Sequence, residues 1–266
     1  MVALLKVAVL NSCTAATAAQ VQDWVKACEI QMNRDYFRAA VKAGVVSVKY
    51  YGKGAVAPLD AWWIAVIDDA DMADALGYHD LTVAGLPIGK VFVKTAISYG
   101  ERPSVTLSHE LLEMLGDPYV NVVVADGLNI RRYWAKEVCD AVEAFSYPIT
   151  LPATLTKPAR TVEVSDFVLD NYWNTVPTKR PYSFKDNLTG PVPALAKGGY
   201  MAFEENGVWD QVVKFQSPPP TANQVPTPTH AIEFLRKRLD SNLDLRRAKR
   251  RIARNSLIRS TAKKVG

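Results

Sequence analysis

The chain has 266 residues, of which 48% are hydrophobic and 22% are charged, proportions that are ordinary for a soluble globular protein. It contains no stretch that is long and apolar enough to span a membrane, and its three cysteines do not make a disulfide framework. We therefore expect a protein of a reducing compartment without a membrane partner, large enough for one domain with appendages.

The net charge of +5 is unevenly distributed. The segment from Ala231 to the end contains twelve Lys or Arg and three Asp or Glu, a net charge of +9, so the remainder of the chain carries −4. The sequence thus predicts a mildly acidic body with a basic tail.

The first part of the chain predicts strands and one long helix. The apolar start, Val2 to Leu10, contains Lys6 and favours a strand over a signal peptide. The segment from Ala15 to Ala43 has helical spacing of apolar residues. Val45 to Tyr51 and Ala61 to Ile67 are rich in β-branched and aromatic residues, which favours two further strands.

Shorter elements follow. Ala70 to Gly77 predicts a short helix, Gly77-Tyr78-His79-Asp80 opens a predicted glycine-rich loop, and Ile88 to Thr95 predicts a fourth strand. A helix comes next, which gives the order strand, helix, strand, strand, strand, helix. A generic α/β sheet would satisfy this order.

That next helix carries the most informative pattern of the chain. Ser104 is a plausible N-cap, and Gly116 followed by Pro118 ends the helix. An apolar face is formed by residues at helical spacing, namely Leu107, Leu111, Leu112 and Leu115.

His109 and Glu113 are four residues apart, so both project from one face of this helix, with Glu110 beside them. This is the zinc-peptidase motif H-E-x-x-H with its second His replaced by Glu, an H-E-x-x-E pattern. In that chemistry the helix supplies two metal ligands, and Glu110 would be the general base. The alternative is an ordinary ion pair on the solvated face of an amphipathic helix.

A catalytic zinc site usually has three protein ligands, so a third ligand is required. Glu137 and Asp140 arrive from a later segment, and we favour Glu137 as the ligand and Asp140 as support that orients His109 or another ligand. Asp117 is an alternative ligand from the disturbed end of the helix.

Zinc is the favoured ion. One His with two carboxylates is a harder ligand set than that of most zinc sites, so weaker zinc binding, occupancy by Mn or Ca, or no bound metal are the alternatives. His79 could join the site, although a His between Tyr and Asp is more often a hydrogen-bonding loop residue. Cys139 could be a soft ligand, although a cysteine is more often simply buried.

The second half predicts a hairpin of Val120–Ala125 and Ile130–Trp134 around Asp126-Gly127, and a strand from Thr161 to Leu169. Little regular structure is expected from Tyr172 to Gly199, and short strands are expected from Gly198 to Phe215. Residues 216–230 form a proline-rich linker and residues 231–266 a basic helical tail, which leaves residues 1–215 as the globular domain.

Several motifs together resemble a poorly characterised family of zincin-like phage and prophage proteins associated with the virion. The segments that carry the resemblance are Gly77-Tyr-His-Asp80, Gly85-Leu-Pro-Ile-Gly89, Ser108-His-Glu-Leu-Leu-Glu-Met-Leu-Gly-Asp-Pro118, Glu137-Val-Cys-Asp140 and Ser165-Asp-Phe167. The resemblance implies an α/β (α+β) fold, with a zincin-like domain of mixed sheet and active-site helix. It also implies that the strand before this helix, here Gly89 to Val93, is an edge strand able to pair with a peptide.

Two functions follow as expectations. The favoured one is a virion structural or virion-associated protein, made in the cytoplasm of the bacterial host and built on a zincin-like metal-binding scaffold. The other is an active zinc-dependent metallopeptidase in which Glu110 takes a proton from the metal-bound water.

The basic tail is expected to bind other virion proteins or DNA, since a dense cluster of like charges is relieved by acidic or phosphate groups. A solvated surface helix is the alternative. The residues assigned to this contact are Arg246, Arg247, Lys249, Arg250, Arg251 and Arg254.

Overall fold

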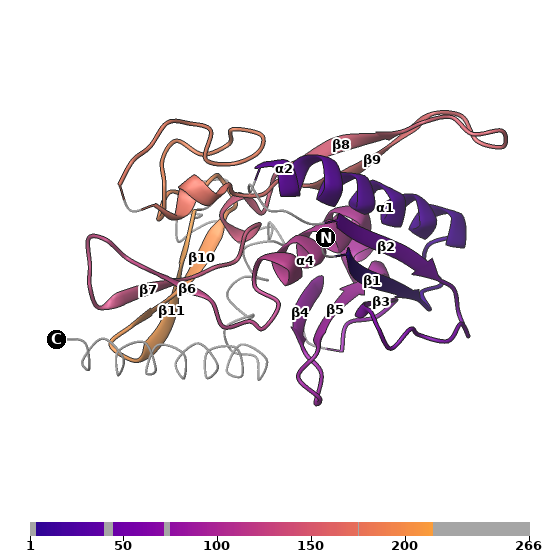
Figure 1. The fold of residues 1–266 in the computed structure, drawn as a ribbon, viewed down its shortest axis with the longest axis horizontal. Helices are drawn as coiled ribbons and strands as arrows, with labels where there is room; N and C mark the ends of the chain where they lie inside the picture. Colours follow the sequence, from indigo (N-terminus) through magenta and orange to yellow (C-terminus); the bar gives the residue numbers. More distant parts are fainter. Residues whose placement is uncertain (1–3, 40–44, 72–74, 175, 215–266) are drawn as a thin grey trace, which may run out of the picture.

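The computed structural model describes residues 4–39, 45–71, 75–174 and 176–214 (Figure 1). These residues form a mixed α/β fold with three sheets and few helices. The predicted linker and basic tail lie outside the described residues. Within the described residues, every helix is too short or too polar to cross a membrane.

The N-terminal half forms a five-stranded sheet whose strand order is β2-β1-β3-β5-β4. Its strands are β1 (Leu4–Asn11), β2 (Val45–Tyr51), β3 (Trp62–Ile67), β4 (Gly77–Leu81) and β5 (Pro87–Phe92). β1, β2, β3 and β5 are parallel, whereas β4 is antiparallel to β5. β4 is therefore an edge strand of this sheet.

Two helices pack on this sheet. The helix α1 (Ala18–Ile30) begins at a capping box between Thr17 and Gln20 and packs on β2. It continues as a π-helical turn (Gln31–Tyr36) and α2 (Phe37–Ala39). The second helix, α4 (Pro103–Gly116), follows the short α3 (Val93–Ser98) and packs on β4, β5 and α1.

The helix α4 lies near the middle of the molecule (Figure 1). Eleven of its 14 residues are buried, including His109, Glu110 and Glu113. This burial rules out the alternative of a helix with a solvated polar face. The buried carboxylates instead require compensation from other groups, because an uncompensated buried charge is costly.

The second half of the described chain adds antiparallel strands. β6 (Val123–Ala125), β7 (Arg132–Ala135), β10 (Tyr200–Glu205) and β11 (Val208–Val213) form a sheet of order β11-β10-β7-β6. β8 (Ser146–Leu151) and β9 (Arg160–Ser165) form a separate hairpin, which packs on α1 and α4. Two 3₁₀ turns, Asp140–Val142 and Asp170–Trp173, lie between these strands.

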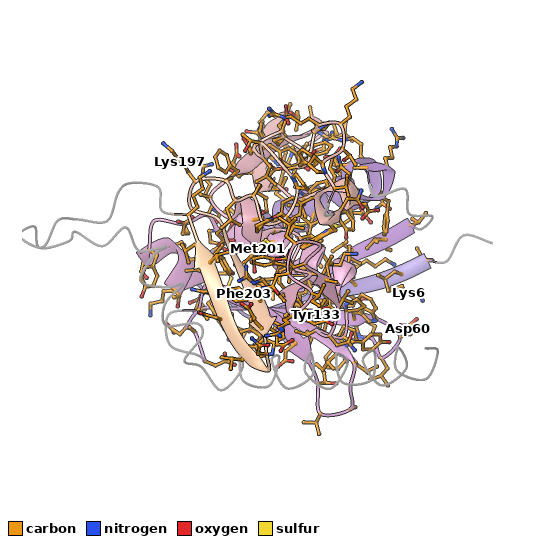
Figure 2. All side chains as sticks on the ribbon, turned by 90° about the vertical axis from the view of Figure 1, so that its left-hand side faces the viewer. Lys6, Asp60, Tyr133, Lys197, Met201 and Phe203 are labelled. Carbon is orange, nitrogen blue, oxygen red and sulfur yellow. The ribbon has the colours of Figure 1, made fainter. Side chains whose placement is uncertain are left out.

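One hydrophobic cluster contains residues of the first sheet, of α4 and of the second sheet, for example Ile64, Leu111 and Trp134. Figure 2 shows the side chains of the described residues, with Met201 and Phe203 of β10 near the middle of the view and Lys6 and Asp60 at its right-hand side. The two sheets therefore share a core around α4.

Most predicted elements are confirmed, with some corrections. Gly77 to Asp80 belongs to the strand β4 and not to a loop, and the edge strand is β4, whereas the predicted edge strand Gly89–Val93 overlaps the internal β5. The helix α4 begins at Pro103 after Arg102, so Ser104 is not its N-cap. The strand β8 was not predicted.

Candidate metal centre

The helix α4 brings two polar side chains into the core. His109 and Glu113 are one helical turn apart, and the Nε2 atom of His109 lies 3.2 Å from the Oε1 atom of Glu113. His109 is 5% exposed and Glu113 is fully buried. The pairing predicted from their spacing is therefore confirmed, in a buried environment.

The edge strand β4 contributes a second histidine. Gly77 permits the close approach of β4 to α4, since a Cβ atom at this position would lie 2.8 Å from Thr106 and 2.9 Å from Glu110. His79 lies two residues after Gly77 and therefore on the same face of β4. It is fully buried, and its Nδ1 atom lies 3.5 Å from the Oε2 atom of Glu113. The two oxygens of Glu113 thus face two different histidines.

The segment after β7 supplies three carboxylates. An Oδ1 atom of Asp140, in a 3₁₀ turn, lies 3.4 Å from Nε2 of His109. The Oε2 atom of Glu137 lies 3.7 Å from Nε2 of His79. The Oε2 atom of Glu143 lies 2.9 Å from Nδ1 of His109.

These side chains form two groups whose ligand atoms lie within 4.8 Å of one another. One group contains His79, Glu113 and Glu137, and the other contains His109, Glu113 and Asp140. All five residues are buried, so these groups could hold a metal ion in the protein interior.

The donor atoms fit a metal site better than a hydrogen-bonded network. The Nε2 atom of His109 and the Oε2 atom of Glu113 are buried and have no hydrogen-bond partner. Buried polar atoms nearly always have such a partner. Glu143 beside Nδ1 favours the proton on that nitrogen, which leaves the lone pair of Nε2 for a metal ion.

The pKa values of His109 and Glu113 are shifted by the opposite charges of their neighbours in the cluster. Burial by itself lowers the pKa of His109, but the charges of Glu113 and Glu143 outweigh it and raise this pKa well above the ordinary value. Burial likewise raises the pKa of Glu113, but His109 and His79 outweigh it and hold this pKa well below the ordinary value. The cluster therefore attracts positive charge.

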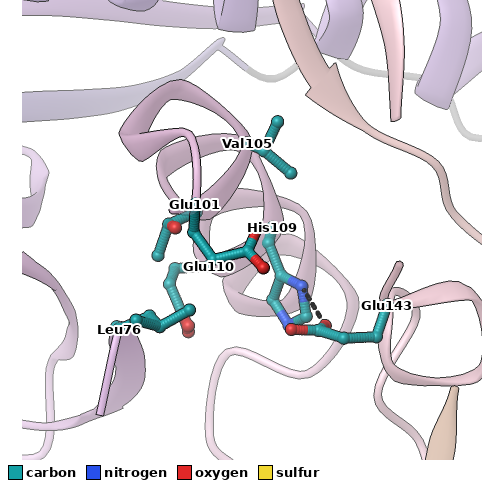
Figure 3. Close-up of a pocket in the computed structure, with 8 residues that line it drawn as sticks. Leu76, Glu101, Val105, His109, Glu110 and Glu143 are labelled. Carbon is teal, nitrogen blue, oxygen red and sulfur yellow. Dashed lines mark ion pairs between the residues drawn. The ribbon is translucent and has the colours of Figure 1, made fainter. Parts of the chain in front are cut away.

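A small pocket opens beside this cluster (Figure 3). It is lined by Leu76, Gly77, Glu101, Val105, Thr106, His109, Glu110 and Glu143. Its cavity of about 30 Å³ has room for about two water molecules. Glu110 borders this pocket, and its Oε2 atom is buried without a hydrogen-bond partner, 3.6 Å from Nδ1 of His79.

The structure distributes the predicted residues differently from the expected set of His109, Glu113 and Glu137. Asp140 is grouped with His109, whereas Glu137 is grouped with His79. Asp117 accepts hydrogen bonds from the backbone N–H groups of residues 121 and 122 and belongs to neither group, so it is a loop-stabilising residue.

Cys139 also belongs to neither group. Its Sγ atom lies 3.9 Å from the carbonyl oxygen of His109, and burial raises the pKa of its thiol well above the ordinary value. This cysteine is therefore a buried thiol, the more frequent of the two roles considered. His79, by contrast, lies in the strand β4 and belongs to one of the two groups, so it is not a loop residue. In the sequence, the feature that could have identified His79 is the Tyr78-His79-Asp80 segment, which lies before a β-rich stretch.

Comparisons of the chain with family models, with curated proteins and with solved structures find no match.

Proposed function

We propose that this protein is a zincin-like metal-binding scaffold, in which a divalent ion joins α4, β4 and the segment from Glu137 to Glu143. Zinc is the proposed ion, and its ligands come from the two groups that share Glu113. The observation that carries this proposal is the burial of both histidines together with Glu113, Glu137 and Asp140. A divalent ion would compensate these charges, which are otherwise costly inside a protein.

The closure of the site favours a structural role for the metal. Structural metal sites are usually closed, whereas catalytic sites keep an open position for water or substrate. Here the cavity beside the cluster holds about two water molecules, and His109 and Glu110 are only 5% and 3% exposed. A substrate peptide would need a larger opening.

The main role is proposed to be that of a phage virion structural or virion-associated protein. This part of the proposal is supported by the sequence segments that resemble zincin-like phage proteins, which include the β4, α4 and Glu137–Asp140 segments. The same three segments supply the buried groups, so the resemblance and the geometry point to the same region of the chain.

The test is metal analysis of the purified full chain combined with thermal unfolding. A ligand that binds only the folded state at 100 times its Kd stabilises it by about 2.7 kcal/mol, which raises Tm by about 5 to 10 °C in a domain of this size. We expect zinc to raise Tm by about this amount and a chelator to reverse the change. Glu113→Ala should abolish the response, and Glu101→Ala, which alters a pocket residue outside both groups, should preserve it. A chain without metal whose Tm does not respond to divalent ions would disprove the proposal.

A metallopeptidase is the second candidate, and the position of Glu110 favours it. The carboxylate of Glu110 borders the pocket next to His109, as a residue that takes a proton from water must. A bound zinc ion would supply an activated water. The edge strand β4 begins at Gly77 in the same pocket, so an extended peptide could pair beside it.

For this candidate, Glu110→Gln should abolish peptide hydrolysis and leave the metal content unchanged. Retained turnover would show that Glu110 is not the base. If the wild-type chain loaded with metal hydrolyses no member of a peptide library, the structural role is favoured.

A further inference from the structure

We infer that the site holds two divalent cations, with the carboxylate of Glu113 bridging them. One ion would be bound by His79, Glu113 and Glu137, and the other by His109, Glu113 and Asp140. This inference rests on the proposed metal-binding function and extends it from a mononuclear to a dinuclear centre.

The first argument is the orientation of Glu113. Its Oε1 atom faces Nε2 of His109 at 3.2 Å, and its Oε2 atom faces Nδ1 of His79 at 3.5 Å. A carboxylate that presents one oxygen to each of two histidines has the arrangement of a bridging ligand. Two-metal sites hold their ions about 3.5 to 4 Å apart, a separation that one carboxylate can span.

The second argument comes from the distances within each group. Two ligands bound tetrahedrally at about 2.1 Å from one ion lie about 3.4 Å apart. In the His109 group, Nε2 lies 3.2 Å from Glu113 and 3.4 Å from Asp140. In the His79 group, the two distances start from different ring nitrogens, with Nδ1 lying 3.5 Å from Glu113 and Nε2 lying 3.7 Å from Glu137. An ion in this group would use one of these nitrogens. The two separations in the His109 group therefore match the edges of a coordination tetrahedron, and in the His79 group the three ligand atoms lie within 4.8 Å of one another.

The third argument is that one ion cannot satisfy both groups. The two groups share Glu113 alone, and among the described residues no group of mutually close ligand atoms contains both histidines. A single ion in the His109 group would leave the Oε2 atom of Glu113 buried and without a hydrogen-bond partner, as it is now.

The fourth argument is charge. Five carboxylates converge on the two histidines, namely Glu110, Glu113, Glu137, Asp140 and Glu143. Counted as carboxylates beside neutral histidines, they carry a formal charge of −5. One divalent ion leaves −3 and two leave −1, so two ions compensate this buried charge far better.

The experiment is a titration of the metal-free full chain with Mn²⁺ and, separately, with Zn²⁺. Bound metal is counted by elemental analysis after removal of free ions, and the Mn²⁺ form is examined by electron paramagnetic resonance. We expect close to two ions per chain and an exchange-coupled Mn²⁺ spectrum, because the bridging carboxylate brings the two ions together. His79→Ala and Asp140→Ala should each hold close to one ion, without exchange coupling.

Glu113→Ala should lose the coupling and at least one ion, while the control Glu101→Ala should keep both ions. Circular dichroism establishes that each variant is folded before its metal content is compared. One ion per wild-type chain at saturation would overturn the dinuclear centre and leave the proposed metal-binding function standing. No bound ion would overturn both. Two ions without exchange coupling, or two ions that survive in both His79→Ala and Asp140→Ala, would also overturn the bridge.

Discussion

The Oε2 atom of Glu143 lies 2.9 Å from the Nδ1 atom of His109, on the side of the imidazole ring that faces away from Asp140. A carboxylate in this position orients the ring and increases the basicity of the opposite nitrogen. No role for Glu143 was assigned from the sequence. In the structure it supports a histidine of the candidate metal centre.

We therefore predict that Glu143→Gln weakens metal binding by about 10- to 100-fold, the usual cost of losing such a supporting carboxylate. The number of ions bound at saturation should stay the same, because Glu143 belongs to neither ligand group. Competition with a chelator of known affinity measures the change in Kd. Glu101→Gln alters the same pocket and serves as the control. Equal affinities for the two variants would contradict this role of Glu143.

Gly77→Ala should destabilise the protein and weaken metal binding. The added methyl group would lie within 3 Å of Thr106 and Glu110, and overpacking of this kind costs about 1–3 kcal/mol. It would also push β4, and His79 with it, away from α4. Chemical denaturation measures the loss of unfolding free energy.

The matched control for Gly77→Ala is Gly190→Ala. A Cβ atom at Gly190 meets only Ala194, at an ordinary contact distance of 3.7 Å. The control should leave stability and metal affinity nearly unchanged. A Gly77→Ala variant as stable as this control would show that β4 can move away from α4 at little cost.

Asp23 should make a pH-dependent contribution to stability. This residue of α1 binds the hairpin of β8 and β9, with Oδ1 lying 2.5 Å from Arg160 and 3.1 Å from Lys157. Its hydrogen bond with Arg160, opposed by burial and assisted by Lys157, lowers the pKa of Asp23 below the ordinary value of 3.8. A lowered carboxyl pKa means that the stabilisation is complete well above that value and is lost as the pH falls through the lowered pKa.

We accordingly expect Asp23→Asn to lower Tm by a constant amount between pH 7 and about pH 5, with the difference from wild type disappearing in stronger acid. Asp186→Asn is the control, because its pair with Arg180 is half-exposed and surface pairs contribute little. A Tm difference that persists unchanged in strong acid would show that Asp23 acts through packing instead of charge.

The basic tail should be a separate binding unit. Its arginine and lysine cluster lies outside the described residues, so this prediction rests on the sequence charge of +9 from Ala231 onward. Truncation after Ser217 should leave the body folded and abolish binding to DNA or to phage particles. Filter binding at several salt concentrations measures the effect, since phosphate contacts give a steep salt dependence. An unchanged affinity and salt slope in the truncated chain would exclude a role of the tail in these contacts.

The parts of the fold that sequence predicts well are those with clear local periodicity. The leucines of α4 and the β-branched runs of β2 and β3 gave elements whose bounds differ by at most a residue or so from the observed ones. The strand β8 was missed because Pro148 lies in its middle, and a proline argues against a strand unless the strand lies at an edge. β8 pairs with β9 alone in a two-stranded sheet, where a proline is tolerated.

The candidate site was only partly predictable for a different reason. His109 and Glu113 were found because their spacing is local to one helix. The contribution of His79 depends on a strand pairing that places β4 outside β5, and on the close approach allowed by Gly77. The grouping of Glu137 with His79 and of Asp140 with His109 depends on the 3₁₀ turn at Asp140. Neither relationship is encoded in a residue spacing.

The position of β5 between β3 and β4 has a consequence for biosynthesis. During translation β4 is completed before β5, yet β5 is the strand to which β4 is hydrogen-bonded. His79 therefore leaves the ribosome without the neighbour that will fix its backbone, and Glu137 and Asp140 follow more than fifty residues later. Capture of the proposed metal ion would therefore come late in synthesis, once the chain has emerged beyond Glu143. The nascent sheet of β1, β2 and β3 is the part that can assemble before it.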